Sequence, residues 1–215
     1  MNLQELNQKY EAMSVEDRIT NVYRDFDKIL FTSSFGTSAA ILLHLISKLK
    51  PEQKVHFIDT TYHFAETMAY RDQLTELLNL NLENVLPSDW KNAFTREDQT
   101  WTKDPDLCCS INKVEPLDGL KPDHEVWMSG LMRFQNTERK SRKIFEKKGN
   151  LLKFHPIIDL SEEDQRAYFE NNNLPKHPLE KAGYHSIGCA QCTFKGKGRS
   201  GRWGNSAKTE CGLHL

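Results

Sequence analysis

The spacing of hydrophobic and polar residues along the chain predicts helices and buried strands in alternation. Residues 3–25 place apolar side chains at helical intervals, which is typical of one or two surface helices, with Ser14 as an N-cap. Short apolar runs further along predict strands, and helical patterns follow them. The strands are expected at residues 28–32, 55–59, 80–85, 125–130 and 151–158, and the helices from 39, from 63 and from 161. This order predicts an α/β fold in which helices flank a parallel sheet. Pro156 indicates that 151–158 is an edge strand.

The first predicted strand runs directly into a small polar loop, residues 33–38 (SSFGTS), before the next helix. Such a loop can hold an anion, because its N–H groups and the positive end of the helix dipole face the ligand. The loop lacks the Gly-Lys-Ser/Thr ending of a Walker sequence, and an ordinary turn has the same composition. Thr60 and Gly130 end two further strands, so we expect them at the same edge of the sheet.

Composition and charge exclude several classes of protein. The 215 residues carry a formal net charge of -1, so no overall positive field marks a nucleic-acid binder. No apolar run is long enough to span a bilayer, and the first residues lack a secretory pattern. We therefore expect a cytoplasmic protein without membrane contact, whose five cysteines are not disulfide staples. We expect one domain over residues 1–194 and a mobile C-terminal tail over 195–215.

The stretch 133–148 is strongly basic, with seven Lys or Arg residues and two acids. Most of these charges suit a solvated helix face with a Glu138–Arg142 pair. Arg133 is different because it follows a strand end. There its guanidinium would lie near the anion site, where it can bind phosphate or sulfate through two parallel hydrogen bonds.

Four of the five cysteines form two close pairs, Cys108-Cys109 and the CxxC of Cys189 and Cys192. A structural zinc site, a redox CxxC and an iron–sulfur cluster all use such residues. We favour the cluster over zinc, because a cluster contains several iron atoms and adjacent thiolates can each bind a different one. Lys113 lies about one helical turn beyond Cys109 and could offset the charge of bound thiolates. Alternatively it is a surface lysine paired with Glu115 or Asp118.

The fifth cysteine, Cys211, lies near the end of a basic tail, and we expect it to carry the chemistry. The stretch 195–208 has five cations and no acid, and cations near a thiol favour the nucleophilic thiolate. Gly212 permits a sharp bend, and His214 can donate a proton near neutral pH. The alternative is a disordered basic end with an incidental cysteine.

Several long motifs, in this order, make the chain similar to the assimilatory adenylyl-sulfate and phosphoadenylyl-sulfate reductases, and specifically to their iron–sulfur branch. They are CCSINKVEPL at 108–117, GYHSIGCAQCT at 183–193, RSGRW at 199–203 and KTECGLH at 208–214. The match spans roughly residues 28–215, and the loop 33–38 resembles the family's modified pyrophosphate loop (PP-loop).

The resemblance implies an adenine-nucleotide α-hydrolase-like fold and a [4Fe-4S] cluster on Cys108, Cys109, Cys189 and Cys192. It implies that Cys211 attacks the sulfur of adenylyl sulfate, that AMP leaves, and that thioredoxin or a glutaredoxin-like dithiol carrier releases sulfite from a Cys S-sulfonate. By motif position, the residues expected around the phosphosulfate are Lys113, Arg133, Arg139, Arg199, Arg202 and His214. Those expected to hold the nucleotide are Ser33, Ser34, Gly36, Ile58, Thr60 and Gly130.

Some positions depart from the family pattern, among them Thr61, Met132 and Phe134. The loop 33–38 is closer to relatives that use the 3′-phosphorylated substrate, so phosphoadenylyl sulfate stands as an alternative substrate. Two further hypotheses are an ATP-using RNA thiolase of the same fold and a zinc-stapled binding module without catalysis. The oligomeric state is left open, with a homo-oligomer as one option.

Overall fold

A six-stranded sheet forms the centre of the computed structural model, which describes residues 2–204, 208 and 210–213. The strand order is β3-β2-β1-β4-β6-β5, and every neighbouring pair is parallel except β5 and β6. The strands are β1 (Ile29–Ser33), β2 (Lys54–Ile58), β3 (Asn81–Val85), β4 (Val126–Met128), β5 (Phe145–Lys148) and β6 (Leu151–Phe154). The predicted α/β class with a parallel sheet is therefore confirmed.

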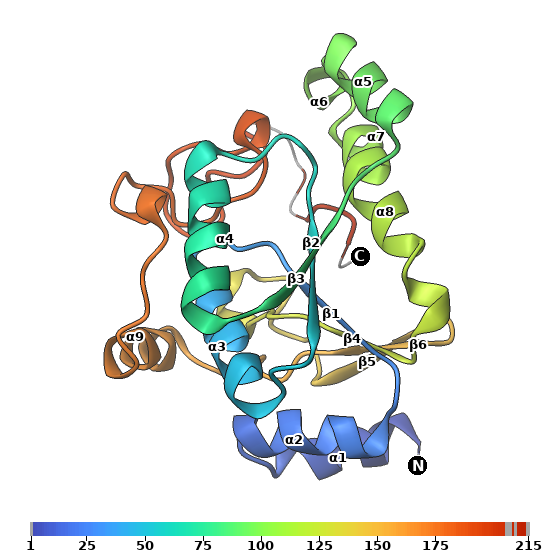
Figure 1. Cartoon of the computed structure of the whole chain (residues 1–215), viewed down its shortest axis with the longest axis vertical. Coiled ribbons are helices and arrows are strands. Elements are labelled where there is room, and N and C mark those ends of the chain that lie inside the picture. The colour runs from blue at the N-terminus through green and yellow to red at the C-terminus, as the bar shows by residue number, and fades with distance from the viewer. Residues whose placement is uncertain (1, 205–207, 209, 214–215) are drawn as a thin grey trace.

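Helices cover both faces of this sheet (Figure 1). One layer holds α3 (Ala39–Leu49), α4 (Ala65–Leu78) and α9 (Glu162–Asn171). The other holds α5 (Asp89–Glu97), α6 (Thr100–Lys103), α7 (Pro105–Cys109), the π-helical turn η1 (Ser110–Val114) and α8 (Glu115–Asp118). The N-terminal helices α1 (Leu3–Glu11) and α2 (Val15–Asp25) lie across the end of the sheet opposite the C-terminal tail. Short 3-10 turns are η2 (Lys121–Asp123), η3 (Arg133–Gln135), η4 (Pro178–Glu180) and η5 (Ala190–Cys192).

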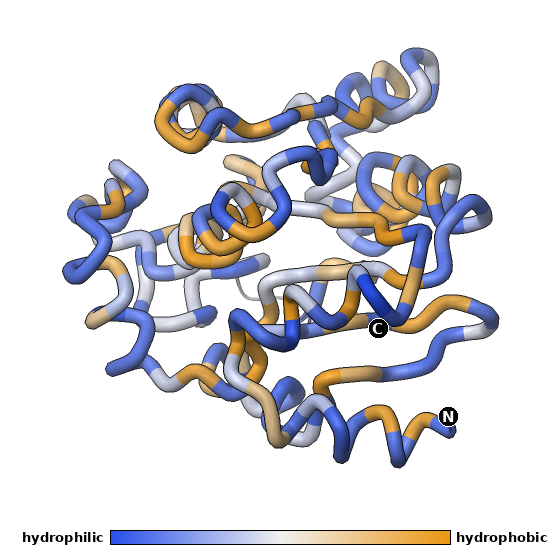
Figure 2. The backbone as a smooth tube through the Cα atoms, turned by 60° about the horizontal axis from the view of Figure 1, so that its bottom comes forward, coloured by the Kyte–Doolittle hydropathy of each residue, from blue (hydrophilic) through white to orange (hydrophobic). Residues whose placement is uncertain are grey.

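Two helix starts agree with the sequence. The Ser14 hydroxyl accepts a hydrogen bond from the backbone N–H of Asp17 at 3.1 Å, and Ser161 does the same for Asp164 at 3.0 Å. Each bond satisfies an N–H group that the first helical turn leaves without a partner. Hydrophobic and hydrophilic residues alternate along the N-terminal helix (Figure 2), as expected of a helix with one face in solvent.

The hydrophobic core is divided by the sheet. The larger cluster lies under α2, α3 and α4 and includes Phe31, Phe57 and Phe154. The smaller cluster consists of Leu30, Ile58, Leu117, Trp127 and Leu151, and the tail residue Leu213 packs against it. The tail is therefore joined to the core of the protein.

The edge-strand prediction is wrong, because β6 lies inside the sheet between β4 and β5. The edge is β5, which lies in the stretch interpreted above as a helix face. Phe145 pairs with Phe154 and Lys148 with Leu151 in an antiparallel hairpin. Gly149 turns this hairpin at φ 63°, a conformation that glycine adopts without strain. Charged residues suit an exposed edge, because they discourage pairing with another chain.

Helix α3 is buried along most of its length. Every residue from Ala40 to Ile46 is buried, including His44, whose Nδ1 lies 2.9 Å from the Tyr168 hydroxyl of α9. The helix contacts α2, α4 and α9 besides the sheet, so little of its surface remains for solvent. None of the described helices is long and apolar enough to cross a membrane.

Candidate active site

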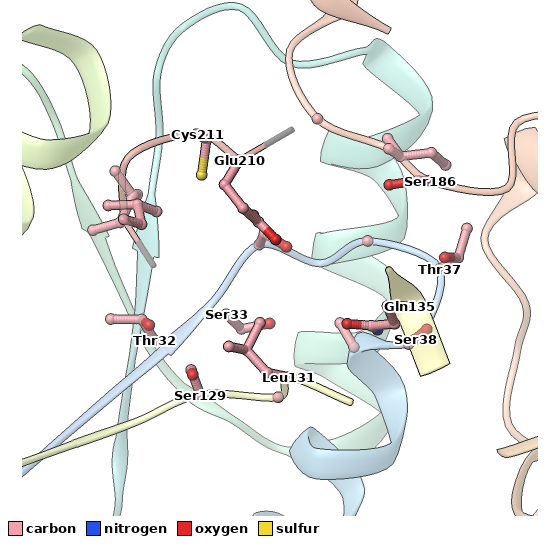
Figure 3. Close-up of a pocket in the computed structure, with 18 of the residues that line it drawn as sticks. Thr32, Ser33, Thr37, Ser38, Ser129, Leu131, Gln135, Ser186, Glu210 and Cys211 are labelled. Atoms are coloured by element: carbon pink, nitrogen blue, oxygen red, sulfur yellow. The ribbon is translucent and has the colours of Figure 1, made fainter. Parts of the chain in front are cut away.

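A cavity of about 200 Å³ opens at the carboxyl ends of β1, β2 and β4, where parallel sheets of this kind bind ligands. The loop after β1 forms one wall, the segment after β4 forms the floor, and the C-terminal tail lies across the top. In Figure 3, Ser33 and Ser129 lie on one side of the cavity, and the Cys211 sulfur points into it from the other.

The loop after β1 is held by a buried aromatic ring. Phe35 has φ 47°, an unusual value for a residue with a side chain, and its ring is fully buried against Phe57 at a centroid distance of 5.5 Å. This burial fixes the polar residues on either side, so that Ser33, Ser34 and Gly36 line the cavity. Helix α3 begins directly after them, and its N-terminal dipole adds positive potential.

Four cationic side chains line the same cavity: Lys113, Arg139, Arg199 and Arg202. Arg139 and Arg202 are 5% and 8% exposed, so their charges are poorly screened by water. Burial and the neighbouring Arg139 charge lower the pKa of Arg199 to about 10, and it remains cationic at neutral pH. The cavity is therefore suited to a ligand with several negative oxygens.

Lys113 is a buried lysine on η1 and not a surface residue. The acids proposed as its partners bind elsewhere: Glu115 pairs with Lys91 at 2.5 Å and Asp118 with Lys121 at 2.5 Å. Burial alone would lower the pKa of Lys113, but the neighbouring cysteines, led by Cys189, raise it above its usual value. Its charge therefore lies between the anion cavity and the paired cysteines.

The tail carries Cys211 to the cavity through three contacts with the rest of the fold. Lys208 pairs with Asp106 at 2.5 Å, Glu210 pairs with Arg139 at 2.7 Å, and Leu213 packs on the smaller core cluster. Gly212 has φ 82°, which accommodates the bend predicted for it. Cys211 itself is partly exposed and lines the cavity.

Beside the cavity lies a second, smaller pocket, which is lined by Cys108, Cys109, Cys189 and Cys192. All are free thiols. Among the described residues, no group of three or more His, Cys, Asp or Glu side chains is arranged to hold a metal ion. A cluster makes a different demand, because each thiol binds a separate iron.

The surroundings of these thiols fit a thiolate-bound group. Burial raises the pKa of Cys108 to about 12 and that of Cys192 to about 11. Both thiols therefore stay protonated until a metal cation binds and displaces their protons. The Thr60 hydroxyl lies 3.3 Å from the Cys189 sulfur. Trp203 lines the pocket, and its indole Nε1 is buried without a hydrogen-bond partner among the described residues.

The structure brings together most of the residues singled out from the sequence. Of the predicted substrate residues, Thr60 and Arg133 do not line the cavity, and the others that the structure describes do. Thr60 is fully buried beside Cys189, and Arg133 donates from Nε to the Arg142 carbonyl at 3.0 Å. His214 lies outside the described residues. The roles of all these residues remain predictions.

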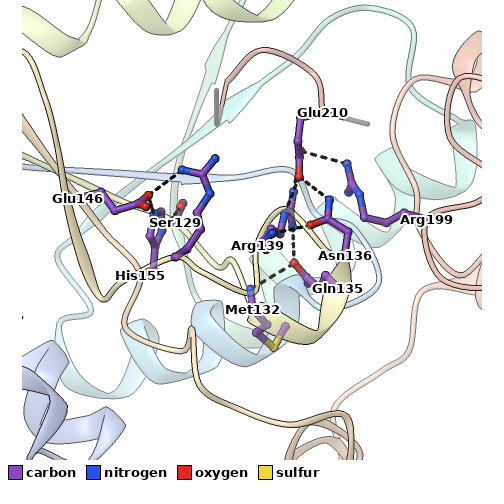
Figure 4. A network of polar contacts seen from close by, with 10 residues as sticks. Ser129, Met132, Gln135, Asn136, Arg139, Glu146, His155, Arg199 and Glu210 are labelled. Atoms are coloured by element: carbon purple, nitrogen blue, oxygen red, sulfur yellow. Dashed lines mark hydrogen bonds and ion pairs between the residues drawn. The ribbon is translucent and has the colours of Figure 1, made fainter. Parts of the chain in front are cut away.

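Sequence reasoning missed several residues of the cavity wall. Gln135, Ser129 and Gly188 line it, and so does Glu210, whose carboxylate binds two arginines (Figures 3 and 4). The sequence did contain a signal for Glu210, because an acid directly before the tail cysteine is unusual in an otherwise basic segment. His63 also lines the cavity, and burial lowers its pKa to about 4, so its ring is neutral at pH 7.

Taken together, the sheet topology, the serine-rich loop, the cationic cavity and the tail thiol define an α/β protein of the PP-loop class with a cysteine at its cavity. A family profile described as "Phosphoadenosine phosphosulfate reductase domain" matches residues 28–195. The chain belongs to this family.

Full-length relatives support the assignment. A protein of Chelativorans sp. named adenosine 5'-phosphosulfate reductase is 39% identical, over 98% of this chain and 90% of the relative. One of the same name from Halalkalibacterium halodurans is 36% identical, over 100% of this chain and 97% of the relative. The aligned region therefore spans the positions of the tail and the cysteine pairs as well as the sheet.

Solved structures support the fold. Phosphoadenylyl-sulfate reductase from Candida auris superposes with a TM-score of 0.78 at 23% identity, covering 90% of this chain and 98% of that one. NH3-dependent NAD synthetase from Campylobacter jejuni gives 0.56 at 17% identity, covering 86% and 79%. The expected PP-loop architecture is thereby confirmed.

Proposed function

We propose that the protein reduces adenylyl sulfate to sulfite and AMP in assimilatory sulfate reduction, with Cys211 as the nucleophile. The observation that carries this proposal is that the Cys211 thiol lines the same cavity as the serine-rich loop and four cations. The relatives named adenosine 5'-phosphosulfate reductase support the substrate.

In the first step, the Cys211 thiolate attacks the sulfur of the sulfo group. A sulfur–sulfur bond forms, the bond from that sulfur to the phosphate oxygen breaks, and AMP leaves with the electron pair. The oxygens around the sulfur repel a thiolate, so Lys113, Arg139, Arg199 and Arg202 lower the barrier by neutralising them and the departing phosphate. Ser33, Ser34, Gly36, Ile58 and Gly130 would hold the nucleotide in the cavity.

In the second step, a dithiol carrier supplies two electrons. One of its thiolates attacks the Cys211 sulfur and releases sulfite, and its second thiol then closes a disulfide and returns Cys211 to the thiol form. Dividing the reduction in this way replaces one difficult transfer by two displacements at sulfur. We propose thioredoxin or a glutaredoxin-like protein as the carrier. His214 would donate a proton or hydrogen bond near Cys211.

We also propose that Cys108, Cys109, Cys189 and Cys192 bind a [4Fe-4S] cluster. When bound, it supplies electrostatic and structural support beside the anion cavity. Lys113 connects the two sites, since its charge is close to the thiols and it lines the cavity. The five free cysteines further suggest a reducing compartment, and we propose a cytoplasmic location.

The decisive experiment is mass spectrometry of the protein after incubation with adenylyl sulfate and no reductant. The wild type should acquire a sulfo adduct on the peptide that contains Cys211, and added thioredoxin should remove it as sulfite. Cys211→Ser should form no adduct and release no sulfite while retaining its iron. Sulfite release by this variant would refute the nucleophile.

Phosphoadenylyl sulfate is the second candidate substrate, because the loop 33–38 resembles that of relatives using it and the family profile carries that name. Sulfite release from the two nucleotides at equal concentration separates these alternatives. An RNA thiolase of this fold would instead hydrolyse ATP, so ATP consumption without sulfite release would favour it.

A further inference from the structure

Glu210 places a carboxylate in a site made for an anion. Its two oxygens accept four hydrogen bonds: from Arg139 Nε at 2.7 Å, Arg139 Nη2 at 2.9 Å, Asn136 Nδ2 at 2.9 Å and Arg199 Nη2 at 3.1 Å (Figure 4). Glu210 is 3% exposed and Arg139 is 5% exposed. A two-pronged, buried arginine–carboxylate pair of this kind is among the strong polar contacts in proteins.

The position of this acid is unexpected for a cavity that receives an anion. Glu210 is the one acidic side chain among the described residues that line the cavity. It adjoins the cysteine that must approach a negatively charged group, so its own charge opposes both the nucleophile and the ligand. A carboxylate at this position must therefore make other contacts that stabilise it by more than this repulsion costs.

The partners of Glu210 provide these contacts. Arg139 and Arg199 are two of the four cations that line the cavity, where an oxyanion ligand would bind. Burial alone would raise the pKa of Glu210, but its hydrogen bonds and its closeness to Arg139 and Arg199 lower it, so the side chain is an anion at neutral pH. Glu210 thus satisfies the same donors that a phosphate or sulfo group would use.

The residues that hold Arg139 in place lie outside the tail. The Asn136 side chain accepts a hydrogen bond from the backbone N–H of Arg139 at 2.9 Å, and Gln135 accepts one from Arg139 Nη1. The loop after η3 therefore holds the arginine in place from below, whichever anion occupies the outer side of the guanidinium. An exchange of anions requires no rebuilding of this loop.

We propose that Glu210 is an internal counter-anion, which holds the Cys211 tail on the cavity and is displaced from Arg139 and Arg199 when the oxyanion of the substrate binds. This inference rests on the proposed function for the identity of the substrate. The displaced carboxylate releases the tail segment around Cys211, while Lys208 and Leu213 keep it close to the cavity. Glu210 is thus a positioning residue that links ligand binding to the freedom of the nucleophile.

The test compares the wild type with Glu210→Gln, which keeps the shape of the side chain and removes its charge. Without competition, binding of AMP and of inorganic phosphate, measured by calorimetry, should tighten about fivefold or more. Adenosine, which carries no oxyanion, should bind equally to both proteins. Glu170→Gln removes a charge from an exposed position of α9 and serves as the matched control. Unchanged or weaker phosphate binding by Glu210→Gln would overturn the proposal.

A second measurement needs no variant. Alkylation of Cys211 by iodoacetamide, followed on its peptide by mass spectrometry, should become faster in the wild type as inorganic phosphate is added, because the tail is released. Slower or constant alkylation would contradict displacement. Neither measurement depends on turnover. If the protein binds AMP as described but releases no sulfite, the proposed function is refuted and the role of Glu210 stands.

Discussion

The α-carbon of Gly188 faces the guanidinium of Arg202 so closely that a side-chain carbon there would lie 2.2 Å from Nη2 and 2.6 Å from Cζ. Gly188→Ala should therefore push this guanidinium out of the cavity wall. We expect kcat/KM for adenylyl sulfate to fall by roughly 100-fold, as for other displacements of about 1 Å near reacting groups.

The control for this change is Gly119→Ala, because a side-chain carbon at Gly119 would meet its nearest neighbour at an ordinary 3.4 Å. Circular dichroism and thermal unfolding should show both variants folded. Normal kinetics in Gly188→Ala would mean that Arg202 has room to move without loss of function.

Arg139 should be irreplaceable by lysine. Arg139→Lys keeps the charge but loses the planar fork whose Nε and Nη2 bind both oxygens of one carboxylate. We expect the dissociation constant of AMP to rise about tenfold, in line with the strength of two-pronged charged hydrogen bonds. Arg24→Lys, at the exposed end of α2, should leave it unchanged, and an unaltered constant for Arg139→Lys would remove Arg139 from the binding site.

The cysteines should divide into two groups by metal content. Protein purified without oxygen should contain iron and sulfide, and Cys192→Ser should lose much of both, because one corner of the cluster would lack its thiolate. Cys211→Ser should keep the iron and sulfide of the wild type. Elemental analysis and visible absorption measure the difference, and zinc in place of iron would support the zinc-stapled alternative.

His177 should make the fold sensitive to acid. Its Nδ1 accepts a hydrogen bond from the Leu179 N–H at 3.2 Å, so Nε2 carries the proton and donates to the Thr67 hydroxyl at 3.1 Å. Burial lowers the pKa of His177 to about 4, although Glu66 acts in the opposite direction. The unfolded chain, with a histidine pKa of about 6.5, therefore binds the proton first.

The contribution of His177 to stability is complete above pH 6.5 and is lost as the pH falls towards 4, by up to about 1.4 kcal/mol per pH unit. His177→Asn should reduce the difference in unfolding free energy between pH 7 and pH 5, measured with urea. His185→Asn, at an exposed position, should not. An unchanged difference in His177→Asn would show that another group sets the acid response.

The sequence was informative wherever a local pattern decides the structure. Apolar runs located β1 and β2, the N-cap Ser14 located the start of α2, and polar residues after strands located the cavity. These signals are local. The residues that carry them come together in the fold because parallel strands end at the same edge of the sheet.

The rest depended on contacts between distant segments. The β5–β6 hairpin was missed because Lys147 and Lys148 lie at an exposed edge, where a strand carries the same charges as a solvated helix. The burial of Lys113 depends on the CxxC about 80 residues away, since Cys189 approaches it only in the folded chain. The Glu210–Arg139 pair likewise joins residues far apart in sequence.

The packing of Leu213 against the smaller core cluster gives the protein an internal optical reporter. Trp127, which belongs to that cluster, is 1% exposed, and its indole N–H donates to Thr32 of the cavity wall at 2.8 Å. Departure of Leu213 from this cluster would admit water beside the ring, and the emission of the indole would shift to longer wavelengths. Fluorescence of the unlabelled protein therefore reports whether Leu213 stays on the core when a ligand releases Glu210.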